Sequence, residues 1–176
     1  MTGGSEANGG SEIEIGESFV GVGAEAAHVN TVLGARSGPV GTAWATALAT
    51  PSAGHAPFVA VVRPGLPAKP LTLFVNKAAI AGERHGQLTW GAAQAGVASG
   101  VMDAVAAGDV APSQVDGLAL IAAVWVDPEA RDADAVYRNN REATARALAA
   151  GRRRAPALAD VLAARAQPSN PFFTPR

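Results

Sequence analysis

The positively charged residues of this 176-residue chain are unusual in kind, since 12 are arginines and only two, Lys69 and Lys77, are lysines. Both lysines lie in one short stretch of the sequence. An ammonium group is compact, carries three rotatable donors and can lose its proton when it is desolvated, which a guanidinium does not do. The choice of lysine here indicates a site for proton transfer or a directional hydrogen bond. A lysine can equally be a solvated surface residue whose stem lies along apolar surface, and residue type alone leaves both explanations open.

A second candidate site follows a glycine turn at positions 21–23. His28 and Asn30 are two residues apart on a predicted strand, so their side chains point to the same face of a sheet. An imidazole can donate or accept a proton near neutral pH, and a neighbouring amide can orient a polar ligand. A single histidine on a strand is, however, more often a structural residue. Gln94 and Lys77 would bind a heteroaromatic ligand if the fold brought them together, which spacing alone does not establish.

Other kinds of site are not supported by the residue pattern. Gly21-x-Gly23-x-x-Ala26 superficially matches a dinucleotide-binding loop, but a strand is predicted after it instead of the required helix. The three histidines have no metal-ligand spacing, so no metal is expected. The chain has no cysteine, which excludes disulfides and thiolate nucleophiles. It has no Gly-x-Ser-x-Gly nucleophile motif either.

Composition narrows the possible partners. Net charge is −1, which argues against binding to nucleic acid or to an anionic membrane. The longest apolar run, residues 118–126, is too short to cross a bilayer, and the N-terminus has no signal-peptide pattern, so we predict a cytoplasmic protein. Charged residues make up only 16% of the chain, against roughly 25% in typical soluble domains. This low fraction favours a surface that is partly covered by other subunits.

Hydrophobic periodicity predicts one α/β domain over residues 13–151, with a flexible lead at 1–12 and a C-terminal tail at 152–176. The order β-β-α-β-β-α-β-α predicts a two-layer α/β sandwich, with a mixed sheet and helices packed on one face. Trp44, Trp90 and Trp125 lie in apolar segments and are expected to be core or interface anchors. Strands are predicted at 13–22, 26–33, 58–62, 71–80 and 118–126, and helices at 39–50, 85–107 and 130–150.

Several short motifs in this order resemble the formaldehyde-activating enzyme family. The resemblance covers roughly residues 13–151, which is nearly the whole predicted domain. Because the motifs occur together and in order, they support one another. The motifs are IGESFVG at 15–21, GAEAAH at 23–28, GARSGP at 34–39, TAWA at 42–45, GHAPFVAV at 54–61, PGLPAKP at 64–70, FVNK at 74–77, GAAQ at 91–94 and YRNNREAT at 137–144.

The resemblance implies a lyase that condenses formaldehyde with tetrahydromethanopterin to the methylene derivative and water, in one-carbon metabolism and formaldehyde detoxification. It implies a homopentamer with the pterin between subunits and no permanently bound cofactor. By resemblance His28 stands at the catalytic position, as general acid, and Lys77 and Gln94 match pterin-contacting positions. Val59 falls where the family has an apolar contact.

The chain departs from the family at three places near the expected site. Asn30 replaces an aspartate two residues after the catalytic histidine, and Ala79 replaces a ligand-contacting threonine. Residues 124–128 stand where the family usually has Phe-Ile-His-Trp. An amide cannot accept a proton or stabilise an imidazolium as a carboxylate does. Two alternatives therefore stay open beside the family reaction: condensation of a small aldehyde with another amine, and a non-catalytic oligomer that binds a pterin or another small molecule.

Overall fold

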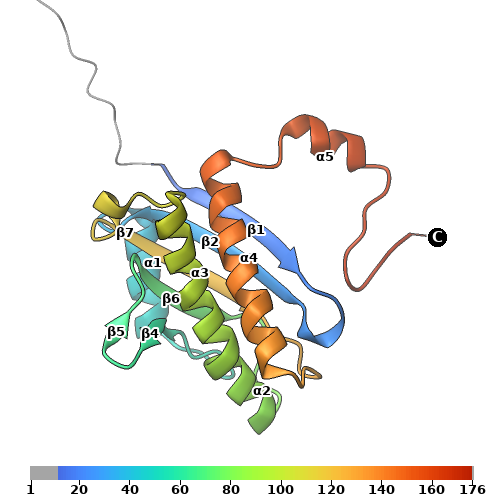
Figure 1. The fold of residues 1–176 in the computed structure, drawn as a ribbon, viewed down its shortest axis with the longest axis horizontal. Helices are drawn as coiled ribbons and strands as arrows, with labels where there is room; N and C mark the ends of the chain where they lie inside the picture. The colour runs from blue at the N-terminus through green and yellow to red at the C-terminus, as the bar shows by residue number, and fades with distance from the viewer. Residues whose placement is uncertain (1–11, 176) are drawn as a thin grey trace, which may run out of the picture.

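The protein folds around one mixed five-stranded sheet, described by a computed structural model that covers residues 12–175 (Figure 1). The expected flexible lead lies outside these residues apart from Glu12. The strand order is β1-β2-β7-β6-β3; β6 and β7 are parallel and the other pairs antiparallel. The strands are β1 Glu14–Val20, β2 Ala27–Ala35, β3 Phe58–Val59, β6 Leu71–Asn76 and β7 Leu118–Trp125, and a separate two-stranded sheet consists of β4 Val61–Arg63 and β5 Leu66–Pro67.

Two long helices, α3 Gln94–Ala107 and α4 Ala133–Arg153, pack on one face of the sheet. Alternate residues of each strand point toward them, and Phe74, Leu120 and Val97 are fully buried in this layer. Residues 83–93, in α2 Glu83–Gln87 and a π-helical segment Leu88–Ala93, lead directly into α3. The α4 helix is capped at its N-terminus by Asp132, whose carboxylate accepts the Ala135 N–H at 3.0 Å. The predicted α/β fold with a mixed sheet is confirmed.

Glycines set how closely α3 and α4 approach. A Cβ on Gly96 would lie 2.5 Å from the Tyr137 carbonyl oxygen, and a Cβ on Gly100 would collide with the carbonyl oxygen of Arg141. The glycines of α3 therefore serve a contact within the chain. The same two helices are joined at their surface by Arg141, which forms two hydrogen bonds to Asp103.

One detail of the predicted architecture is wrong, because helix α1 Pro39–Ala49 lies on the opposite face of the sheet from α3 and α4 (Figure 1). Gly34, which points away from α4, faces the Val40 side chain, with only 2.7 Å between an added Cβ and Cγ2. The Trp44 indole donates to the Leu71 carbonyl at 3.1 Å on that side. Periodicity shows that a helix has an apolar side but not which face of the sheet it covers.

The largest differences between the predicted and observed element boundaries are at three places. The strand predicted at 71–80 stops at Asn76, whose side-chain amide donates to the carbonyls of Gly54 and Ala78 and so holds a turn. The strand predicted at 58–62 is split between the two sheets at Ala60. The predicted C-terminal tail begins inside α4, which ends at Arg153, and includes the exposed helix α5 Leu158–Ala164.

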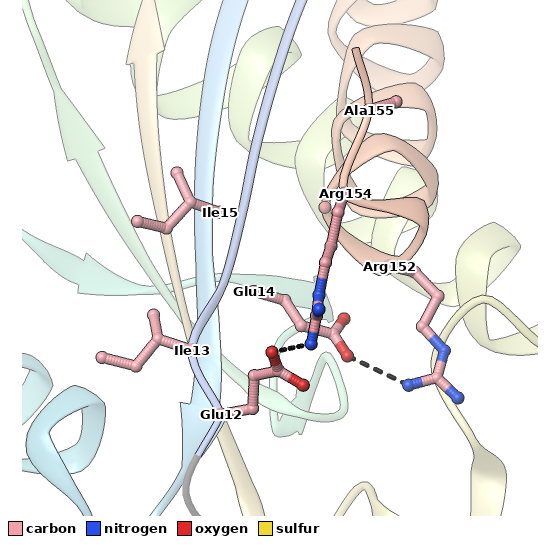
Figure 2. A pocket seen from close by; sticks show the side chains of 8 residues that line it. Glu12, Ile13, Glu14, Ile15, Arg152, Arg154 and Ala155 are labelled. Carbon is pink, nitrogen blue, oxygen red and sulfur yellow. Dashed lines mark hydrogen bonds and ion pairs between the residues drawn. The ribbon is translucent and has the colours of Figure 1, made fainter. Parts of the chain in front are cut away.

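The start of β1 and the end of α4 are tied by charged side chains, shown in Figure 2. Arg152 pairs with Glu14 at 3.1 Å, and Arg154 pairs with Glu12. These four residues line a depression of about 510 Å³. Its carboxylates are already matched by guanidinium groups, and exposed pairs of this kind each contribute roughly 0–1 kcal/mol. We therefore assign this depression to the scaffold.

Candidate active site

The part of the sheet that α1 does not cover carries a cluster of polar residues. Glu17 of β1 and His28 and Asn30 of β2 point to this open face, because they occupy alternate positions on paired strands. Lys77 follows β6, and its backbone N–H donates to the Val124 carbonyl at 2.8 Å. That bond continues the β6–β7 ladder by one residue, so the Lys77 side chain lies on the same face.

Direct hydrogen bonds join the cluster. Lys77 Nζ donates to Asn30 Oδ1 at 2.6 Å and lies 3.3 Å from His28 Nδ1. On the other side of the ring, His28 Nε2 lies 2.9 Å from Glu17 Oε1. The imidazole is thus held at both nitrogens, by an ammonium and by a carboxylate. The fold brings together three of the predicted site residues, His28, Asn30 and Lys77.

Burial and neighbouring charges shift the acidities of this cluster. Partial burial and the Lys77 ammonium lower the pKa of His28, and the Glu17 carboxylate opposes them. Burial also lowers the pKa of Lys77, again against the effect of Glu17. Near neutral pH the cluster therefore holds a neutral imidazole beside an ammonium that gives up its proton more easily than a solvated lysine. That arrangement suits proton transfer to a bound molecule.

A cavity of about 1030 Å³ lies over the cluster. Its lining includes the four residues just described, three aromatic side chains, and the polar residues Asp127, Ser169 and Asn170. Phe19 lies 6.1 Å from the His28 ring, between ring centroids. Trp125 is met edge-on by Phe172 of the C-terminal segment, at 5.9 Å and 85°. The cavity has the size and the mixed apolar and polar lining of a small-molecule site.

The other three predicted site residues do not line this cavity. Val59 lies on β3, the edge strand farthest from β1. Gln94 is buried at the start of α3, where its side-chain oxygen accepts the Val61 N–H at 2.5 Å. Ala79 lies beside Gly54. Within one chain, His28 and Gln94 therefore belong to different places.

Several residues of the cavity were not predicted from the sequence. Glu17 and Phe19 alternate along β1 as His28 and Asn30 do along β2, so all four side chains lie on one face. The sequence contains this alternation, but the pairing of β1 with β2 is needed to use it. Asp127 follows β7, and Phe172 comes from the C-terminal segment that follows α5. Trp125, expected as a core or interface anchor, lines the cavity.

In the part of the chain that the structure describes, residues 12–175, no group of three or more His, Asp or Glu side chains is placed to hold a metal ion. Likewise, none of its helices is long and apolar enough to cross a membrane.

The fold and the cluster define a small α/β protein with acid–base groups at an open sheet face, and comparison identifies its family. The family model described as formaldehyde-activating enzyme (Fae) matches residues 15–173. The chain therefore belongs to the formaldehyde-activating enzyme family, a family of enzymes, as the sequence motifs predicted.

Curated relatives agree with this assignment. The chain is 40% identical over 158 residues to a 5,6,7,8-tetrahydromethanopterin hydro-lyase of Methanosarcina barkeri, covering 90% of this chain and 89% of that protein. It is 42% identical over 135 residues to a bifunctional enzyme Fae/Hps of Methanosarcina mazei, covering 77% of this chain. A bifunctional enzyme Fae/Hps of Methanosphaera stadtmanae is 37% identical over 160 residues, covering 91% of this chain. The chain spans 34% and 39% of these two longer proteins.

Proposed function

We propose that this protein is a carbon–oxygen lyase that condenses formaldehyde with tetrahydromethanopterin, or a similar tetrahydropterin diamine, to the methylene adduct and water. The observation that carries the proposal is the hydrogen-bonded set of His28, Lys77 and Asn30 in the cavity of a member of this family. No permanently bound cofactor is required. A cytoplasmic location remains a prediction from the sequence.

The proposed chemistry needs one well-placed proton. A pterin nitrogen adds to the formaldehyde carbon and forms a carbinolamine. Protonation of its hydroxyl allows the C–O bond to break, which releases water and leaves an iminium ion. The second nitrogen then adds to that carbon and releases its proton. His28 is the general acid in this scheme, a role that contributes about 10²–10⁴-fold, and holding both reactants in register adds to it.

In this scheme Asn30 helps to position Lys77 by a hydrogen bond and takes no part in proton transfer. Its amide oxygen accepts a hydrogen bond from Lys77, as a carboxylate would, but it adds no negative charge to the site. It thereby orients the ammonium toward the cavity. The same substitution, together with Ala79, motivates the two alternatives: a paralogue that uses a different amine, and an oligomer that binds without catalysis.

We propose that the site is completed by a second copy of the chain, in a ring that the resemblance suggests is a pentamer. Exposed apolar side chains gather at the two opposite edges of the sheet. Ile15 and Phe19 lie on the edge strand β1, where Phe19 is paired with His28. Leu66 lies on β5, which pairs with β4, and Trp90 lies one helical turn before Gln94. Two different surfaces that pair head to tail produce a ring and not a two-fold dimer. Such a contact would bring Val59 and Gln94 of one copy toward His28 of the next.

The test is to follow methylene-adduct formation from formaldehyde and tetrahydromethanopterin with and without protein. We expect acceleration over the spontaneous reaction, and we expect His28→Ala to lose about 10²-fold or more of it. An unchanged rate in the variant would remove His28 from the mechanism. His55→Ala is a matched control, because His55 lies outside the cavity and bonds the Asn76 carbonyl.

The alternatives are separated by Asn30→Asp. If the native protein is folded and oligomeric but inactive with tetrahydromethanopterin, and Asn30→Asp creates activity, the native chain is a retargeted enzyme or a binder. Assays of the native protein with other diamines then distinguish these two. Full activity of the native protein with ordinary affinity for tetrahydromethanopterin would instead show that an amide is tolerated at this position.

A further inference from the structure

Glu17 contacts the His28 imidazole on the side away from Lys77, and the family motifs do not identify it as a site residue. Glu17 Oε1 lies 2.9 Å from His28 Nε2, on the side opposite Lys77. We propose that Glu17 is the positioning carboxylate of His28, which fixes the tautomer of the ring and supplies the negative charge that Asn30 lacks. This inference rests on the proposed function for its catalytic meaning.

The backbone gives Glu17 a defined place. In the β1–β2 register Glu17 lies opposite Asn30, and Phe19, two residues further along β1, lies opposite His28. The neighbouring residue, Gly16, lies so close to the Ala147 carbonyl of α4 that a Cβ there would collide with it. Because β1 is pressed against α4 on that side, the alternation of the strand directs Glu17 to the open face. The Glu17 side chain therefore points to the face that carries the His28 ring, where its exposed carboxylate contacts Nε2.

The hydrogen-bonding capacities fix the tautomer. An ionised carboxylate only accepts, so Nε2 must carry a hydrogen that it donates to Glu17. In a neutral ring Nδ1 is then an acceptor, which matches the Lys77 ammonium facing it. The remaining charged group of the cavity, Asp127, has a carboxylate oxygen engaged with the Glu129 N–H at 2.8 Å. Glu17 is thus the carboxylate bonded to the ring.

This arrangement assigns each proton in the step that releases water. A proton moves from Lys77 Nζ to His28 Nδ1, which leaves a neutral amine and an imidazolium bonded to Glu17. Because Nε2–H is already donated to Glu17, the proton that passes to the carbinolamine hydroxyl comes from Nδ1. The C–O bond breaks with its electron pair on oxygen, and water leaves. The proton released when the second nitrogen adds restores the original state of the pair.

The test is Glu17→Gln, which keeps the size of the side chain and removes its charge. The imidazole nitrogens of His28 are followed by NMR through a pH titration, with His28→Asn used to assign its signals among the three histidines. We expect the variant to titrate at lower pH and to lose the preference for the Nε2–H tautomer. Glu14→Gln is the matched control, since Glu14 lies on the same strand and pairs with Arg152. An unchanged titration and tautomer in Glu17→Gln would overturn the proposal.

Activity provides the second readout. With tetrahydromethanopterin we expect the activity of Glu17→Gln to fall at least about tenfold, as part of the contribution that general acid catalysis makes. The variant should change kcat more than KM, and its pH–rate profile should move to lower pH. Glu17→Asp, which retains the charge, should restore part of the rate. If Glu17→Gln does not fold, the titration of His28 in Glu17→Asp decides the question, because a native-like titration is expected only where a carboxylate reaches the ring.

The two proposals fail in different ways. If the native protein does not accelerate the reaction but the His28 titration moves in Glu17→Gln, the proposed function is wrong while the positioning role stands. If the native protein is active and Glu17→Gln changes neither the titration nor the rate, the positioning role is wrong while the function stands.

Discussion

At the scale of single residues, the chemistry of this protein depends on four side chains, three of them on β1 and β2 and the fourth on the residue that follows β6. Glu17, His28, Asn30 and Lys77 form one chain of contacts, with distances of 2.6–3.3 Å. The lysine is the residue that the composition singles out, because it is one of only two in the chain. Its effect on His28 is electrostatic and can be measured apart from catalysis.

We predict that Lys77→Met raises the pKa of His28. Burial is the largest cause of the lowered pKa, and the positive charge of Lys77, which the variant removes, is the second. The pKa of His28 lies below its ordinary value of 6.5 in the folded chain, so the unfolded chain binds more protons just below that pH. The free energy of unfolding therefore decreases as the pH falls through this window, and Lys77→Met should weaken that decrease. Urea unfolding at pH 7.5 and 5.5 measures it.

Lys69→Met is the control for that experiment. Lys69 is exposed and pairs with Asp116, away from the cavity. It should leave both the His28 titration and the pH dependence of unfolding unchanged. A similar shift in both variants would mean that the effect comes from net charge and not from contact with the ring.

At the scale of the elements, the site depends on how α4 packs against β1 and α3. Gly16 lets β1 lie against α4, and Gly96 and Gly100 let α3 approach α4 closely. These contacts involve backbone atoms, which cannot move aside as a flexible side chain can. The packing of α4 on one face of the sheet thus fixes the position of β1, and with it the position of the functional residues on the opposite face.

We predict that Gly96→Ala lowers the free energy of unfolding by about 1–3 kcal/mol, since the added methyl forces the two helices apart. Its Cβ would lie 2.5 Å from the Tyr137 carbonyl oxygen. Gly91→Ala is the matched control, because a Cβ there meets no atom within 4 Å. It should be neutral or stabilising by up to about 1 kcal/mol from helix propensity. Equal destabilisation by both variants in chemical unfolding would contradict this account.

The surface bond between the same helices should depend on pH. Hydrogen bonding to Arg141 lowers the pKa of Asp103 below its usual value. The resulting stabilisation is present above that usual value, near 3.8, and is lost as the pH falls through the lowered pKa. Because both side chains are partly exposed, we expect Asp103→Asn to cost no more than about 1 kcal/mol at pH 7. The cost should disappear in acid, and a pH-independent cost in urea unfolding would exclude the ion pair as its source.

At the scale of the whole molecule, the predicted site residues are divided between two edges of the sheet. His28, Asn30 and Lys77 share one cavity, whereas Val59 lies on the opposite edge strand and Gln94 at the start of α3. Each place has an exposed apolar side chain beside it, Phe19 in the cavity, 41% exposed, and Trp90 one turn before Gln94, 48% exposed. A ring of identical chains would bury both surfaces and unite the two halves of the site.

We predict that His28→Ala and Gln94→Ala complement each other. Each variant alone should have little activity, but co-refolded subunits in equal amounts should regain activity, because about a quarter of the interfaces then join an intact His28 to an intact Gln94. The assay is methylene-adduct formation at constant total protein. If the mixture is no more active than the average of its parts, although capture of one variant by an affinity tag also retains the other, both residues act within one chain.

The sequence by itself determined the family, the α/β class and the shared face of His28 and Asn30. These follow from local order, because the period of a strand and the sequence of motifs need no knowledge of the fold. It also marked Lys77 through the scarcity of lysine. It placed most helices and strands, since their apolar periods are set by neighbours a few residues away.

Only the tertiary structure decided which side chains meet. Glu17 contacts His28 because β1 and β2 pair in one register, and Lys77 reaches Asn30 because β6 joins β2 through β7. The face covered by α1 and the separation of Gln94 from His28 depend on packing between segments distant in sequence. Such contacts depend on the relative placement of whole elements, which the periodicity of any one segment does not contain. The physical reason is that periodicity specifies a direction within an element, whereas a site requires distances between elements.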